Sequence, residues 1–271
     1  TASAAFAGDV TQGQLQVVDK DGKVVNLCPL KHTDVKADIS GFITRVTVLQ
    51  KFENPFKNPI EAVYVFPLPQ NSAVDDMTMK IGQRTIKGVI KKKEEAKKIY
   101  EDAKRQGKTA ALLDQERPNI FTQSVANIMP GESIIIEISY VETLSYTDGV
   151  YEFVFPMVVG PRYIPGDQAT GHSGTGWSPD TNKVPDASKI TPPVAPKGTR
   201  AGHDISVTVN LNAGLPIKSI KSVLHQVNID KAKNGEKAKI TLSNNDTIPN
   251  KDFILQYETA GKGIKEALLT T

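Results

Sequence analysis

The chain has 271 residues, of which 39% are hydrophobic, and this is enough for one large or two modest domains with a buried core. Its net charge of +3 and its lack of Arg/aromatic clusters argue against nucleic-acid binding. The single cysteine, Cys28, excludes an internal disulfide, and no apolar run is long enough to insert into a membrane.

The first third of the chain predicts short strands separated by turns. Residues 14–27 favour a hairpin, because Asp21-Gly22 is a strong turn signal between valine-rich segments. Further strands are predicted over 42–52, 61–66, 74–81 and 84–90, and the last two are expected to pair as a hairpin around Gly82. In the first of these, alternate positions place four apolar side chains on one face: Phe42, Val46, Val48 and Phe52.

Residues 92–106 predict the one principal helix. Its apolar stripe includes Ile99 and Tyr100, and we expect this face to pack on a sheet. Lysines and glutamates cover the remaining faces, and Gly107 follows as a C-cap. We interpret the lysine run as a solvated helix face rather than a ligand site.

After this helix, residues 120–126 and 133–141 are predicted to pair as strands around the proline and glycine at 130–131. A turn at 148–149 then leads into a strand over 151–156.

Residues 166–202 predict a long Pro/Gly-rich loop, because eight of the 17 prolines lie between Pro156 and Pro196. Three large side chains in and beside the loop are candidate anchors or interface residues: Trp177, Arg162 and Tyr163. Anchoring is the simpler interpretation of Trp177, and exposure at a partner interface is the alternative.

Alternation returns over residues 203–262, with a hairpin signal at Asn234-Gly235 and a last strand around Leu255. These strands either complete the first sandwich or form a second small sheet. The predicted fold class is therefore all-β, an antiparallel β-sandwich with one principal amphipathic helix. The chain divides into residues 1–165, the loop at 166–202, and the C-terminal strands at 203–262.

No short motif in the chain matches the spacing or the context that a known catalytic or ligand-binding motif requires. The GKT string at 107–109 closes a predicted helix, whereas a phosphate loop opens one. The GHSGT string at 171–175 has Thr where a nucleophile elbow requires Gly. The four histidines form no metal-ligand pattern, and the acidic pair Asp75-Asp76 is interpreted as a turn rather than a calcium loop. We therefore predict no catalytic, cofactor-binding or metal-ligating residue.

Several segments together resemble the VIT domain, the vault protein inter-alpha-trypsin domain, over roughly residues 28–165. They are LKHTDVKADISGFITRVTVLQKFENPFKNPIEAVYVFPLP at 30–69, RPNIFTQSV at 117–125, PGESIIIEISYVETL at 130–144, YEFVFP at 151–156 and PRYIPG at 161–166. The later segments at 174–193 and 250–257 look similar to bacterial proteins that join this domain to a von Willebrand A domain, relatives of the inter-alpha-trypsin inhibitor heavy chains.

The resemblance implies a non-enzymatic interaction or scaffold module of a secreted or surface-attached, extracytoplasmic protein. Its expected partner is a downstream von Willebrand A domain of the same polypeptide, whose adhesion-site motif is not matched by DASKI at 186–190. The alternative is a hydrolase whose site is assembled in the loop from His172, Ser173 and Asp180.

Overall fold

The described part of the computed structural model is built from strands and turns. It covers residues 14–20, 24–67, 72–87, 111–117, 120–157, 181–183, 203–244, 247 and 251–260, and no helix occurs among them. The strands form three sheets, which we call sheets A, B and C. The prediction of an all-β fold is thus confirmed for these residues, with three sheets rather than the two of a simple sandwich.

Sheet B is the largest, with eight strands in the described part of the chain. Its order is β15 (Val227–Lys231), β16 (Lys237–Leu242), β13 (Asp204–Asn212), β3 (Leu30–Ser40), β4 (Ile43–Glu53), β10 (Ser133–Thr143), β6 (Ser72–Ile81) and β7 (Arg84–Lys87).

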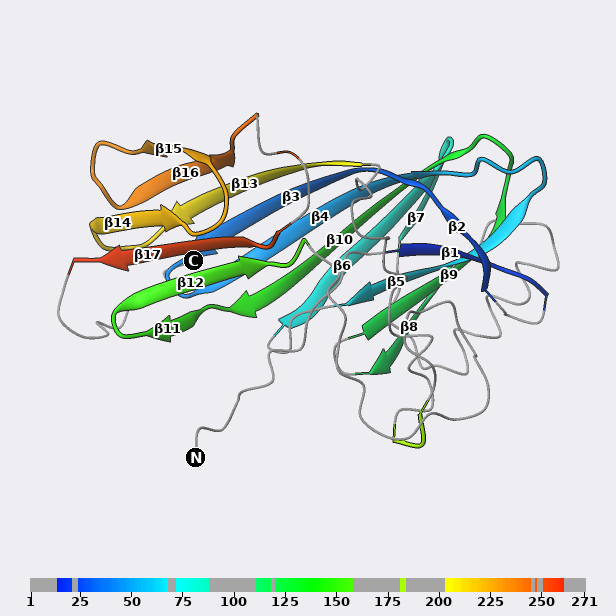
Figure 1. Ribbon diagram of the computed structural model, residues 1–271, viewed down its shortest axis with the longest axis horizontal. Helices are drawn as coiled ribbons and strands as arrows, with labels where there is room; N and C mark the ends of the chain where they lie inside the picture. The colour runs from blue at the N-terminus through cyan, green and yellow to red at the C-terminus, as the bar shows by residue number, and fades with distance from the viewer. Residues whose placement is uncertain are drawn as a thin grey trace.

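Sheets A and C are smaller. Sheet A has the order β2 (Val24–Cys28), β1 (Gln14–Val18), β5 (Ile60–Pro67), β9 (Ile120–Ile128) and β8 (Ala111–Arg117). Sheet C has the order β11 (Ser145–Thr147), β12 (Val150–Phe155), β17 (Phe253–Thr259) and β14 (Ile217–Ser222). Sheet B runs the length of the molecule in Figure 1, with sheet C over one end and sheet A at the other.

Burial alternates along the central strands of sheet B, so one face is buried and the other is exposed among the described residues. On β4, for example, Val46, Val48 and Phe52 are buried, whereas Arg45 and Lys51 are exposed. This is the period of two that a half-buried strand requires. Phe42 departs from the prediction: it is 44% exposed, because it lies in the turn before β4 and not in the strand.

The sequence predicted an antiparallel sandwich, but the sheets are not wholly antiparallel. β13 pairs with β3 in parallel, with Val207 beside Val35 and Leu211 beside Ile39. Alternation of apolar residues defines a face but carries no information on strand direction, so the pattern could not reveal this pairing. Strands on either side of residues 158–202 therefore share sheet B.

The predicted pairing of 120–126 with 133–141 is wrong. β9 pairs with β5 and β8 in sheet A, whereas β10 pairs with β4 and β6 in sheet B. The turn at Gly131 (φ 73°) therefore joins two sheets and does not close a hairpin. The turn is held by buried Asn54, whose Nδ2 donates to the carbonyl oxygens of Ile128 and Met129, both at 3.0 Å.

Three predicted hairpins are confirmed. β1 pairs with β2, β6 with β7, and β15 with β16, all antiparallel. The C-terminal strands extend both sheet B, through β13, β15 and β16, and sheet C, through β14 and β17. The predicted helix at 92–106, with Ile99 and Tyr100, lies outside the described residues, as does nearly all of the loop at 166–202.

Candidate functional site

The exposed face of sheet B is the main candidate surface in the described part of the chain. A row of polar residues crosses five neighbouring strands there, one residue from each strand in direct register. We call this row the polar row. Its members are Asp230 on β15, Lys239 on β16, Asn210 on β13, Asp38 on β3 and Arg45 on β4.

Hydrogen bonds fix the centre of the polar row. Asn210 Nδ2 donates to Asp38 Oδ1 at 2.7 Å, and Lys36 Nζ lies 3.0 Å from Asp38 Oδ2. Partial burial raises the pKa of the Asp38 carboxyl, but hydrogen bonds from Asn210 and Lys36 outweigh it and lower that pKa below its usual value. Asp38 therefore stays ionised and oriented.

At its β4 end the polar row meets an acidic residue of β6. Arg45 Nε lies 2.8 Å from Asp75 Oδ2, and Arg45 Nη2 donates to Ser139 Oγ at 3.3 Å. The Ser139 hydroxyl in turn donates to Asp75. Asp75 thus lies within a strand, not in the turn that the sequence suggested. Ser139 is buried, and its hydroxyl is engaged by both Asp75 and Arg45.

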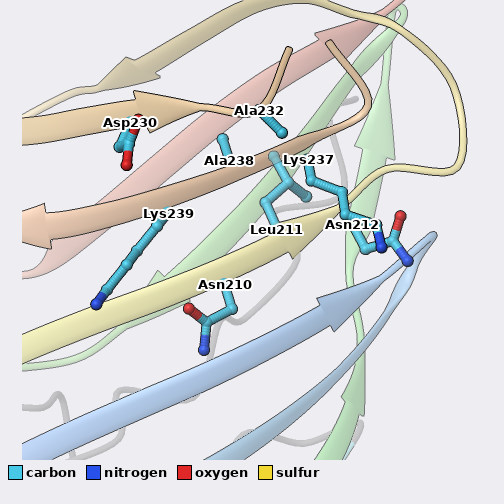
Figure 2. A pocket seen from close by; sticks show the side chains of 8 residues that line it. All are labelled: Asn210, Leu211, Asn212, Asp230, Ala232, Lys237, Ala238 and Lys239. Atoms are coloured by element: carbon cyan, nitrogen blue, oxygen red, sulfur yellow. The ribbon is translucent and has the colours of Figure 1, made fainter. Parts of the chain in front are cut away.

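A hollow of about 360 Å³ lies at the other end of the polar row. Figure 2 shows Asn210, Lys239 and Asp230 projecting from neighbouring strands β13, β16 and β15. Asn212 and Lys237 complete its polar wall. The site is shallow and mixed in charge, which suits contact with a protein surface better than enclosure of a small molecule.

The opposite face of sheet B contains a buried carboxyl. Glu142 is 8% exposed, and burial raises the pKa of its carboxyl to about 7. Its register partner Thr44 is fully buried. Glu142 Oε1 and Thr44 Oγ1 are both without a hydrogen-bond partner in the described structure.

Burial also shifts the pKa values of a cysteine and a histidine. Burial raises the pKa of the Cys28 thiol to about 11, so the thiol is unreactive at neutral pH. Burial also lowers the pKa of His203. Among the described residues, no group of His, Cys, Asp and Glu could hold a metal ion. A search of the same residues finds no helix long and apolar enough to span a membrane.

The sequence-predicted site residues lie elsewhere in the chain. Trp177, Arg162 and Tyr163 are outside the described residues, and so are His172, Ser173 and Asp180 of the hydrolase alternative. Thr181 within this loop is described, and it is buried. The polar row was not predicted from the sequence, although polar residues alternate with buried ones along β3 and β13. The register between strands, which aligns the row, is not readable from one strand at a time.

Residues 30–140 match the family model of the vault protein inter-alpha-trypsin domain. This segment is a VIT domain. The match begins at β3 and ends within β10, so it includes β3, β4, β6, β7 and most of β10 in sheet B, and β5, β8 and β9 in sheet A. The polar row is therefore partly within the VIT domain, through Asp38 and Arg45, and partly beyond it.

Curated relatives share about half of the chain. Human von Willebrand factor A domain-containing protein 5A is 35% identical over 138 residues, which are 50% of this chain and 18% of that protein. Human protein mono-ADP-ribosyltransferase PARP4 is 39% identical over 136 residues, which are 50% of this chain and 8% of that protein. The chain thus spans less than a fifth of the length of either relative.

Among solved structures, a putative nutrient binding protein from Legionella pneumophila is similar at 9% identity, with a TM-score of 0.46. The match covers 93% of this chain and 73% of that one. A likeness at this level carries no argument about function.

Proposed function

We propose that this chain is a non-enzymatic docking and scaffold module that supports a neighbouring von Willebrand A domain through the polar row. The observation that carries the proposal is the open, ordered row of charged residues on the exposed face of sheet B, which begins within the VIT domain. The relatives named for their von Willebrand A domain supply the partner class.

The polar row has the properties of a recognition surface. Charges alternate along it, from Asp230 and Lys239 to Asp38 and Arg45. Such an order favours a partner with the complementary order and disfavours a shifted one, so it gives orientation more than affinity. Hydrogen bonds hold Asp38 and Arg45 in place before binding, which lowers the entropy lost on contact.

The absence of a reaction is part of the proposal. Ser139 is engaged with Asp75 and Arg45, and His225 Nε2 lies 2.9 Å from the carbonyl oxygen of Lys251. The transferase activity named for one relative belongs to a protein of which the matched segment is only 8%. A shared support module is consistent with relatives of such different overall composition.

The test uses the parent polypeptide where it includes an A domain, and compares its melting with that of each piece alone. We expect the joined form to melt at a higher temperature than either piece. Charge reversal by Arg45→Glu together with Asp38→Lys should remove the mutual stabilisation. Lys80→Glu is the matched control, because Lys80 is exposed on β6 of the same sheet but outside the row. Independent melting of the pieces, or equal effects of both variants, would refute docking through the polar row.

An extracytoplasmic location is also part of the proposal. It rests on the resemblance to secreted and surface-attached relatives. Fractionation of the native host, with antibodies against this chain, tests it directly. Recovery of the protein only with cytoplasmic markers would refute the location and leave the docking proposal standing.

A further inference from the structure

Two sheet edges come together at one margin of the molecule. Within the described chain, β15 ends sheet B and β14 ends sheet C. Residues 223–226 connect the two strands, and Ile217 N at the start of β14 donates to the carbonyl oxygen of Gly235 in the β15–β16 turn at 2.8 Å. Figure 1 shows both strands at the same end of the molecule, with β16 between them in this view.

Apolar side chains are exposed along this margin. Val223 is 40% exposed, Leu224 43% and Ile229 40%. Ile229 lies directly opposite Ile240, which is fully buried, so Ile229 belongs to the core face of sheet B. We call Val223, Leu224 and strand β15 the open seam, because side chains on the core side of sheet B are exposed to solvent there.

The opposite edge strand of the same sheet, β7, has its apolar side chain packed against the core. Ile86 on β7 is half-buried and packs against the core, as does Val227 at the start of β15. Ile229 is not among the side chains that pack there. The exposure of Ile229 is therefore not a general property of edge strands in this protein.

The backbone of the open seam has a defined hydrogen-bonding frame. Ala232 N donates to the carbonyl oxygen of Lys237, and Ser243 N donates to that of Gln226, both at 2.9 Å. In an antiparallel pair, hydrogen-bonded positions recur at every second residue. The residues at 227, 229 and 231 therefore direct their N–H and C=O groups away from β16, toward the free edge.

Charge around the open seam is mostly positive. Residues 217–240 contain six lysines and two acidic residues. Lys218 is engaged with Glu258 at 2.7 Å, whereas Lys231 and Lys233 are exposed directly after Ile229. Along β15 toward its C-terminal end, an added strand would lie beside Ile229 and then near Lys231 and Lys233.

We propose that the open seam binds an acidic, extended segment of another protein, which adds to β15 as a further strand. The segment carries apolar residues that cover Ile229 and Leu224, and acidic residues that lie near Lys231 and Lys233. Backbone hydrogen bonds to the outward groups of β15 supply much of the affinity, as in other cases of strand addition. The site lies beyond the VIT domain. It uses the backbone edge of β15, whereas the polar row crosses the exposed face of the same strand at Asp230.

The probe is a nine-residue peptide of alternating valine and threonine with two glutamates at each end. Its binding to the intact protein is measured by fluorescence anisotropy. Amide hydrogen exchange provides the structural readout. We expect slower exchange at Val227, Ile229 and Lys231, whose amides face the free edge, and little change at Asn228 and Asp230, whose amides face β16.

Ile229→Pro removes one outward N–H without removing a hydrogen bond to β16. We expect it to weaken binding roughly tenfold or more, since it deletes a backbone bond and the apolar contact. Thr85→Pro, on the opposite edge strand β7, is the matched control and should leave binding unchanged. Melting of both variants shows that each remains folded.

Five outcomes would overturn the proposal, and the first four concern the peptide and the two variants. In the binding assay, two of these are no binding of the glutamate peptide at millimolar concentration, and equal binding of a peptide with lysines in place of the glutamates. The other two are slower amide exchange at another sheet edge instead of β15, and an equal loss of peptide affinity in the two proline variants. Self-association that Ile229→Pro abolishes would assign the seam to a second copy of this chain and would also reject the acidic partner.

Discussion

The core face of sheet B buries polar side chains in two regions whose surroundings differ. Beneath sheet A, the Tyr64 hydroxyl donates to Gln50 Oε1 at 2.7 Å, and Gln50 Nε2 donates to Thr33 Oγ1 at 3.3 Å. Near the start of sheet C, Glu142 and Thr44 face each other with buried oxygens that have no partner in the described structure. β4 contributes to both regions, through Gln50 and Thr44.

The hydrogen-bonded groups of Tyr64 and Gln50 fix how the two sheets pack, whereas the unpartnered carboxyl of Glu142 destabilises the fold when it is charged. The hydrogen bond from Tyr64 joins sheet A to sheet B at one position, so a shift in their packing would break it. An unpartnered carboxyl in the core costs free energy when it is charged. The two regions should therefore respond in opposite ways when their polar groups are removed.

The largest expected effect is at the paired region. Tyr64 is 1% exposed, and its ring centre lies 6.1 Å from that of Phe52 and 6.0 Å from that of Phe66. We expect Tyr64→Ala to lower the free energy of unfolding by about 3–5 kcal/mol. Urea unfolding measures the loss. Tyr146→Ala is the control, because Tyr146 is 42% exposed, and a similar loss there would contradict the comparison.

At the unpaired region, Glu142→Gln should be stabilising at high pH. Burial raises the pKa of Glu142 from 4.5 to about 7 in the folded protein, so the folded state binds the proton more tightly than the unfolded state. The wild type should lose stability as the pH rises from about 4.5 to about 7, and the loss should then level off. The variant should lack this dependence and gain about 3 kcal/mol at pH 8, with little difference at pH 4.

Urea unfolding of both forms at pH 4, 6 and 8 measures this gain. Glu137→Gln is the matched control, because Glu137 lies on the exposed face of the same strand. A Glu142 variant that is less stable than the wild type at pH 8 would mean that the carboxylate is favourably solvated or paired in solution.

Much of the architecture followed from the sequence, because turns and alternation are local signals. Asn234-Gly235 predicted the hairpin of β15 and β16, and alternate apolar residues predicted the buried face of β4. The pairing of β9 with β5, instead of β10, depends on contacts between distant segments, so local patterns could not distinguish it. The resemblance to the VIT family predicted residues 28–165, and the family model matches 30–140.

The candidate site was less accessible to sequence analysis. Asp38 and Asn210 are 172 positions apart and meet only because β3 and β13 pair in parallel. Glu142 continues the alternation of Ile138 and Tyr140 along β10, so the local pattern does indicate the core face, but it cannot show that the carboxyl lacks a partner there. Trp177, the residue that the sequence favoured as an anchor, stays a prediction. Slow proteolysis near Trp177 in the folded protein is its expected result.

Smaller effects come from single hydrogen-bonding groups in the same two regions. Tyr64→Phe leaves Gln50 Oε1 without its donor and should cost about 1–3 kcal/mol. Thr44→Val removes a buried hydroxyl that has no partner, and should leave stability unchanged or raise it by about 1 kcal/mol. Thermal and urea unfolding at one pH measure both changes. Equal losses in the two variants would show that Thr44 has a partner in solution.

The smallest expected effect is on the exposed face, at the ion pair of Arg45 and Asp75. The Arg45 side chain is 56% exposed and that of Asp75 34%, so water screens the attraction between them. A double-mutant cycle with Arg45→Ala and Asp75→Asn should give a coupling free energy of about 0.2–1 kcal/mol, which should fall as salt is added. Urea unfolding at low and high salt measures it. A coupling well above this range that is insensitive to salt would place the pair in a drier environment, and the polar row would then be part of the folded core rather than a surface for docking.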